Sequence, residues 1–201
     1  IAPSETPTLD NAILPNPTPT SEPPTPTASN PFPDGLVAYS CAISSGNNRI
    51  FLSSPDGQNQ FLLPNQPGNS VVAAFSRDGR QIAYRSNAGG SWQIYVSNVD
   101  GSNLRQITNG DSSSENFEAV WSPDDSQFAF GSERDGPNRQ IYIMNSDGSN
   151  QRRLTFNDAF NDDPSWSINN EIIYESNENG RYSIFRNSLD SGTVVEYILF
   201  G

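Results

Sequence analysis

A repeat of about 45 residues runs through the chain after Gly35 and limits the possible folds more than any other feature. The second unit contains AAFSRDGRQIAYRS and then WQIYVSNVDGSNLRQIT, and the third contains AVWSPDDSQFAFGS and then RQIYIMNSDGSNQRRLT. Phe75, Trp121 and Trp166 hold the same place in successive units, 46 and 45 residues apart. A fixed period of roughly 20–50 residues is typical of architectures in which one small unit stacks on the next.

Each unit reads as four short strands, rich in β-branched and aromatic residues and separated by Asp-Gly or Asn-rich turns. One such sheet cannot bury both of its faces, but sheets stacked around an axis bury one another. We therefore predict an all-β fold, a four-bladed β-propeller or a four-blade part of a larger one. Its units span about 35–69, 70–115, 116–161 and 162–201, and Phe75, Trp121 and Trp166 are predicted to lie in the core between blades.

The strings WSPDD, IYIMNSDGSNQRRLT and PSWS resemble the TolB-type, WD40-like (PD40) propeller repeat. The fourth unit departs from that pattern, with Ile168-Asn169-Asn170 where the family has Pro-Asp-Gly. The resemblance implies a propeller, and it implies function only indirectly. Family members that act as enzymes carry a separate hydrolase domain, whereas others are scaffolds that bind proteins. It also implies a secreted, cell-surface or periplasmic location in a prokaryote.

Histidine is absent and Cys41 is the only cysteine, so the chain cannot form a Ser-His-Asp triad, a Cys-His pair or an intrachain disulfide. We predict no enzymatic activity and no cofactor. Cys41 lies in an apolar strand pattern and is expected to be a buried, small apolar side chain. The 23 acidic against 11 basic residues, with no basic stripe, argue against nucleic acid as a partner. No apolar run approaches 18 residues, so no membrane insertion is expected.

Acidic residues gather between the last strand of one unit and the first strand of the next. One group contains Asp158, Asp162 and Asp163, and another contains Asp111, Glu115 and Glu118. Their spacing does not match an EF-hand loop, so we predict no dedicated metal site and interpret these residues as braces between blades. The three aspartates of the first group remain weak candidates for Ca²⁺.

Residues 1–34 form a different region, which holds most of the 16 prolines and no Trp or Tyr. This composition predicts an extended arm or linker without a core of its own. Its threonines alternate with prolines as in an O-glycosylated stalk, a bare linker being the alternative; the candidate sites are Thr6, Thr8, Thr18, Thr20, Thr25 and Thr27. The arm contains one apolar, strand-like island at residues 9–14, formed by Leu9, Ala12, Ile13 and Leu14.

The first unit opens at Leu36, in a segment that aligns with the second strand of the other units, so we count 15 strands and a first blade without its innermost strand. An open edge of this kind is a template for another segment. The arm of a neighbouring copy could add to it, which predicts head-to-tail assembly and possible filaments. The chain's own arm could fill it and leave a monomeric protein-binding scaffold. The sequence begins at Ile1 and not Met, which is expected if a leader has been removed or if the chain is a piece of a longer protein; in the second case the missing strand lies outside it.

Overall fold

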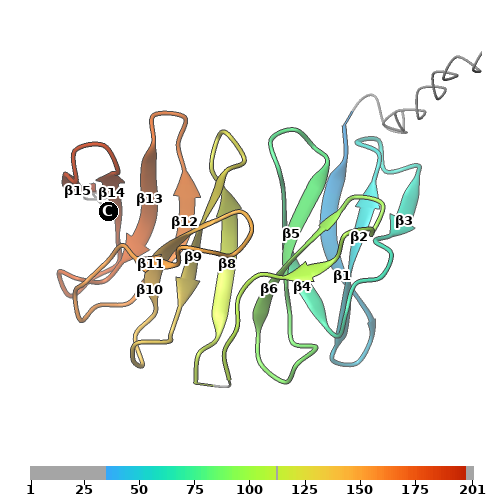
Figure 1. The fold of residues 1–201 in the computed structure, drawn as a ribbon, viewed down its shortest axis with the longest axis horizontal. Coiled ribbons are helices and arrows are strands. Elements are labelled where there is room, and N and C mark those ends of the chain that lie inside the picture. Colours follow the sequence, from blue (N-terminus) through green and yellow to red (C-terminus); the bar gives the residue numbers. More distant parts are fainter. Residues whose placement is uncertain (1–34, 112, 198–201) are drawn as a thin grey trace, which may run out of the picture. The chain divides into compact units, whose positions relative to one another are not determined.

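The computed structural model describes residues 35–111 and 113–197, which belong to a compact unit spanning Asp34–Gly201. These residues form 15 strands in four antiparallel sheets (Figure 1). The first sheet has three strands and each of the others has four, which confirms the predicted distribution. No helix long and apolar enough to cross a membrane occurs in the described part of the chain.

The strands of each sheet follow one another in sequence order. The first sheet contains β1 (Val37–Ser44), β2 (Asn47–Ser53) and β3 (Gln60–Leu62). The second contains β4 (Ser70–Phe75), β5 (Gln81–Ser86), β6 (Gln93–Asn98) and β7 (Arg105–Gln106). The third contains β8 (Asn116–Trp121), β9 (Gln127–Ser132), β10 (Gln140–Asn145) and β11 (Arg152–Arg153). The fourth contains β12 (Asn161–Trp166), β13 (Glu171–Ser176), β14 (Ser183–Ser188) and β15 (Val194–Tyr197).

Each sheet is one blade and packs on the next, from the blue first blade to the red fourth blade in Figure 1. Contacts between neighbouring blades run chiefly through the first strand of the later blade, because β4 packs on β1 and β2, β8 on β4, β5 and β6, and β12 on β8, β9 and β10. The three strands β4, β8 and β12 therefore lie along the inner side of the blades. In residues 35–197, extensive packing between sheets is confined to these three junctions.

One apolar cluster fills each junction between blades. The clusters form because alternate residues of a strand point to opposite faces, so each central strand supplies one set of side chains to each neighbour. The junction of the second and third blades has the most buried apolar residues. Its fully buried members include Ile94 and Val96 from the second blade and Phe128 and Phe130 from the third. The corresponding clusters at the other junctions are equally closed to solvent.

Candidate functional site

The inner edge of β1 is the most distinctive feature of the first blade. Tyr39 of β1 lies directly opposite Phe51 of β2, as Tyr84 of β5 lies opposite Tyr95 of β6, so β1 occupies the place of a second strand. In the other blades a first strand pairs with this edge, but β1 pairs with β2 alone among the described strands. Most of its eight residues are exposed. The eight residues of β1 therefore form an edge that no other described strand pairs with, and such an edge can accept an added strand.

The segment predicted to add to such an edge, with Leu9, Ala12, Ile13 and Leu14, lies outside the described residues. The six threonines proposed as glycosylation sites lie outside them as well.

The three repeat aromatics lie where one blade meets the next. Trp121 is buried in the cluster between the second and third blades, and its Nε1 donates a hydrogen bond to the Ala74 carbonyl of the preceding blade at 3.1 Å. Phe75 and Trp166 are partly buried and pack against the clusters of the other two junctions. All three residues are in contact with the packed apolar side chains of a junction.

A polar network that the sequence analysis missed crosses two of the same junctions. Gln93 of β6 accepts hydrogen bonds from Thr108 at 2.9 Å and from Asn116 of the following blade at 2.8 Å. All three residues are buried, so each bond satisfies a group that would otherwise be costly to bury. The arrangement recurs one blade later with Gln140, Thr155 and Asn161. The signal was present as identical residue types at equivalent places in the second and third repeats.

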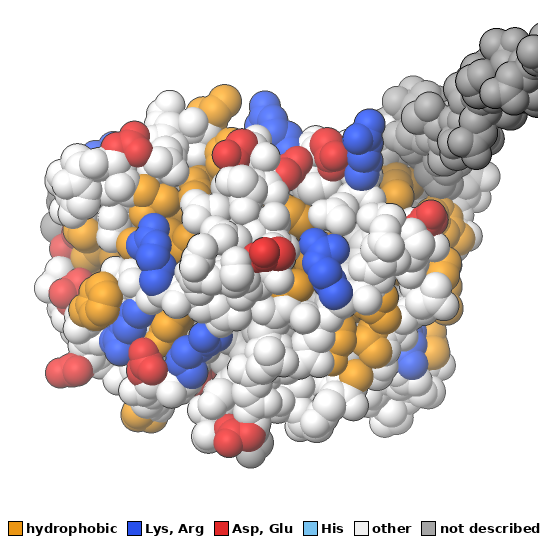
Figure 2. Space-filling view, in the orientation of Figure 1, with side chains coloured by type: hydrophobic (Ala, Val, Ile, Leu, Met, Phe, Trp, Pro, Cys, Tyr) orange, Lys and Arg blue, Asp and Glu red, His pale blue; other side chains and the backbone are white. Residues whose placement is uncertain are grey.

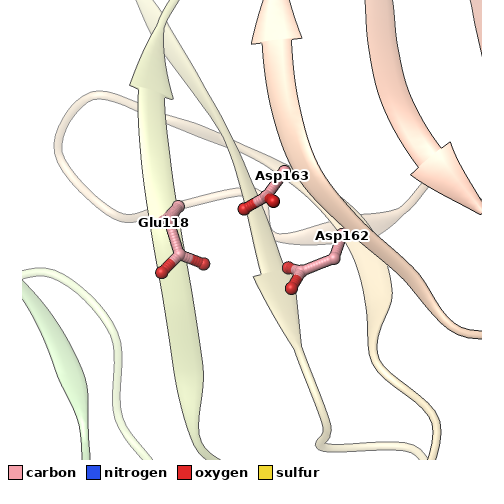
Figure 3. A group of neighbouring side chains, drawn as sticks. All are labelled: Glu118, Asp162 and Asp163. Atoms are coloured by element: carbon pink, nitrogen blue, oxygen red, sulfur yellow. The ribbon is translucent and has the colours of Figure 1, made fainter. Parts of the chain in front are cut away.

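Glu118 of β8 and Asp162 and Asp163 of β12 form an acidic cluster across the junction of the third and fourth blades (Figure 3). Their nearest carboxylate oxygens lie within 4.8 Å of one another. Asp158, which the sequence grouped with Asp162 and Asp163, is not part of this cluster; its backbone carbonyl accepts a hydrogen bond from Asn138 at 2.6 Å. The packing of β12 on β8 across the junction, not the spacing along the chain, brings Glu118 to the two aspartates.

Arginine side chains supply the cations at this cluster. Arg139 forms an ion pair with Asp162 and lies 3.8 Å from Glu118 and 3.7 Å from Glu133. On the other side of Glu118, Arg85 of the second blade lies 3.5 Å away. Both guanidiniums also stack on the Phe117 ring, at 3.2 Å and 4.4 Å from its centroid. The cluster thus braces three successive blades through charge pairs and cation–π contacts.

Three carboxylates, those of Glu118, Glu133 and Asp162, share the two guanidiniums, and the Asp163 carboxylate lies beside them, so negative charge exceeds positive charge around Asp162. Burial raises the pKa of Asp162 to about 6, against the lowering effect of Arg139 and with smaller raising effects from Glu118 and Asp163. Burial disfavours the charged form because the carboxylate loses hydration that one shared guanidinium replaces only in part. Asp162 therefore changes charge near neutral pH at a junction between blades.

Cys41 corrects one expectation. The sequence predicted a buried thiol, but Cys41 is exposed on β1. The apolar pattern around it was read correctly as a strand, yet that strand has no preceding blade among the described residues to cover it. Burial at this position depends on a neighbouring sheet and not on the strand itself.

Charged side chains are interspersed on the face in Figure 2, where acidic and basic groups alternate without a continuous basic stripe. This pattern gives no extended positive surface for a phosphate backbone on that face.

A family model described as the TolB beta propeller domain (PD40) matches residues 25–198. The chain belongs to the TolB β-propeller family. Its structure is similar to a putative TolB from Agrobacterium tumefaciens, with a TM-score of 0.71, 22% identity, and coverage of 81% of this chain and 60% of that one. TolB from Acinetobacter baumannii gives a TM-score of 0.71 and 21% identity, over 83% of this chain and 42% of that one.

The same TolB-like fold also resembles a puromycin hydrolase, with a TM-score of 0.66 and 16% identity, over 82% of this chain and 29% of the hydrolase. At these identities the similarity establishes the fold alone. The chain spans less than two thirds of the length of each of these structures. No curated protein sequence matches it.

Proposed function

We propose that this TolB-like propeller is a non-enzymatic assembly module that joins copies of itself through strand addition at β1. The inner edge of β1, which pairs with no other described strand, is the observation that carries the proposal. A strand added there would gain main-chain hydrogen bonds along eight residues, and its alternate side chains would pack on either side. The occupant we propose is residues 9–14 of a neighbouring copy, and the location is outside the cell, at the cell surface or in the periplasm.

Such a contact is heterologous, because the arm of one copy meets the edge of another. Heterologous contacts close into rings or extend into filaments. The second candidate function is a TolB-like scaffold that binds a different protein at the same edge, which family membership favours. Both functions need no catalytic group, in keeping with a sequence without histidine.

Deletion of residues 1–15 tests the assembly function, because it removes the proposed strand and leaves the compact unit from Asp34 onward intact. We expect the deleted protein to lose higher assemblies and to melt at a lower temperature, since Ile13 and Leu14 would each contribute roughly 1.5–3 kcal/mol when buried. A peptide of residues 7–16 should restore the melting temperature. Replacing Thr18 and Thr20 by Ala in the full chain serves as a control and should change neither property. An unchanged oligomeric state and melting temperature after deletion would rule the proposal out.

A further inference from the structure

Two faces of the blade series carry the residue types that the chain uses at its own junctions. We call the face of a blade that meets the following blade its front, and the face that meets the preceding blade its rear. The rear of the first blade and the front of the fourth blade have no neighbouring sheet extensively packed on them in residues 35–197.

The rear of every blade carries two aromatic residues directly opposite each other on neighbouring strands. In the second to fourth blades both rings are buried beneath the front of the preceding blade; the pairs are Tyr84–Tyr95, Phe130–Tyr142 and Tyr174–Phe185. The first blade has the same pair in Tyr39 and Phe51, stacked with ring centroids 5.7 Å apart but only half-buried. Val37 and Leu62 on the same face are 46% and 45% exposed. The rear of the first blade is thus a junction surface without its neighbour.

The front of every blade carries two residues, two positions apart on the same central strand. They are fully buried apolar side chains in the first three blades: Ile50 and Leu52, Ile94 and Val96, and Ile141 and Ile143. The fourth blade has Ile184 and Arg186 at these places, with Ile173 directly opposite Arg186. Ile173 and Ile184 are only half-buried. The front of the fourth blade therefore resembles the fronts that pack on aromatic pairs at the three internal junctions, and it is complementary to the rear of the first blade.

Arg186 is the one residue of the four fronts that departs from this apolar pattern. Another arginine of the chain shows that a guanidinium can pack against such an aromatic pair. The Arg134 guanidinium lies 5.3 Å and 4.7 Å from the ring centroids of Phe130 and Tyr142, the pair equivalent to Tyr39 and Phe51. Arg186 already pairs with Glu171 at 3.2 Å on its own blade. A guanidinium with its charge partly balanced can stack on aromatic rings at a modest desolvation cost.

We propose that the front of the fourth blade binds the rear of the first blade of a second copy. The second copy is the occupant because its first blade offers the same kind of surface that follows each front at the three internal junctions. Ile184 would share a cluster with Tyr39, as Ile50 shares one with Tyr84. The contact is head-to-tail, and it uses blade faces and not the N-terminal arm.

Site-specific cross-linking of the full chain tests this contact. Two variants are made in a Cys41→Ser background, one with Tyr39→Cys and one with Ile184→Cys. A short bismaleimide should give a cross-linked dimer when the two variants are mixed, and none with either variant alone. The control mixture uses an Ile168→Cys variant in place of the Ile184→Cys variant. Ile168 lies in the turn between β12 and β13 and is 75% exposed, and this mixture should give no cross-linked dimer with Tyr39→Cys.

Ile184→Asp should weaken association by at least about tenfold, because it places an unpaired charge in an apolar junction. Its melting temperature as a dilute monomer checks that it folds, and Ile168→Asp is the matched control. Equal cross-linking in the Ile184 and Ile168 mixtures, or its absence from both, would overturn the face-to-face contact. The N-terminal arm is intact in all these variants. If the cross-link fails but the protein still assembles, the face contact is wrong and assembly by strand addition is still supported. If the cross-link persists after deletion of residues 1–15, the face contact forms without the arm.

Discussion

Asp162 is a buried carboxyl with a raised pKa at the junction between the third and fourth blades. Its carboxylate shares Arg139 with Glu118 and Glu133, and the whole group is largely removed from water. Other aspartates of the chain behave in the opposite way. Hydrogen bonds from Ser122 and then Ser126 lower the pKa of Asp124 to about 2. The two kinds of carboxyl therefore affect stability in different ranges of pH.

The free energy of unfolding should rise as the pH falls from 7 to 5 because of Asp162. Its folded-state pKa is about 6 against an ordinary value of 3.8, so its stabilising contribution is complete below pH 3.8 and is lost as the pH rises through about 6. The gain from this residue between pH 7 and pH 5 is roughly 1 kcal/mol. Asp124 does not interfere, because its contribution is lost only as the pH falls below 3.8 toward 2. Urea unfolding at a series of pH values measures the effect.

Asp162→Asn should abolish the rise in the free energy of unfolding between pH 7 and pH 5. This holds even if the substitution changes the stability at any one pH. Asp158→Asn, an exposed carboxyl outside the cluster, is the matched control and should keep the dependence of the parent chain. If Asp162→Asn and the parent show the same change between pH 7 and pH 5, Asp162 does not titrate in this range.

The turns before the last strand of the first and second blades have the same sequence pattern but different surroundings. Asp56-Gly57 and Asp100-Gly101 both place glycine at positive φ, 72° and 79°. A Cβ added at Gly57 would meet nothing within 4 Å, whereas one at Gly101 would lie 2.6 Å from the Pro64 carbonyl oxygen of the preceding blade. The turn at Gly101 is thus also a contact between blades.

Gly101→Ala should therefore destabilise the propeller more than Gly57→Ala. Positive φ alone costs an alanine on the order of 1 kcal/mol at both positions. At Gly101 the backbone of one blade must also shift against the next, which should add at least about 1 kcal/mol. Chemical denaturation of the two variants gives the comparison, and equal losses would show that the second blade does not hold its turn against Pro64.

The blades together form a series of three junctions, each closed by apolar residues and two of them also by a buried Gln, Thr and Asn. Cations at the acidic cluster come from arginines of the third and second blades. In the described residues, the junctions between blades are thus held by apolar, hydrogen-bonded and charge-paired side chains.

EDTA should leave the melting temperature unchanged. A Ca²⁺ site held at 100 times its Kd would contribute about 2.7 kcal/mol, which corresponds to roughly 5–10 °C for a chain of this size. A fall of that size in EDTA, restored by Ca²⁺ and not by Mg²⁺, would show that the acidic cluster binds calcium in spite of Arg139. Differential scanning calorimetry with and without each ion measures it.

The sequence by itself determined the blade architecture, because periodic apolar strands and Asp-Gly turns are local features that repeat with the period of one blade. It also indicated that the first blade lacks its innermost strand among the described residues, since the first repeat begins one strand late. The repeat also predicted that Phe75, Trp121 and Trp166 lie where one blade meets the next, because each is a large apolar residue at the same position of a repeated strand.

Only the tertiary structure decided what meets across a junction. Glu118 joins Asp162 and Asp163 in place of Asp158 because β8 and β12 pack together, and Arg139 enters the cluster from the segment before β10. Cys41 has the local pattern of a buried residue but is exposed, because no described sheet covers that face. The formation of a strand follows from residues next to one another in the sequence. Burial and charge pairing between blades depend instead on residues that lie 23 positions away (Arg139 and Asp162) or 33 positions away (Arg85 and Glu118), and no local pattern encodes them.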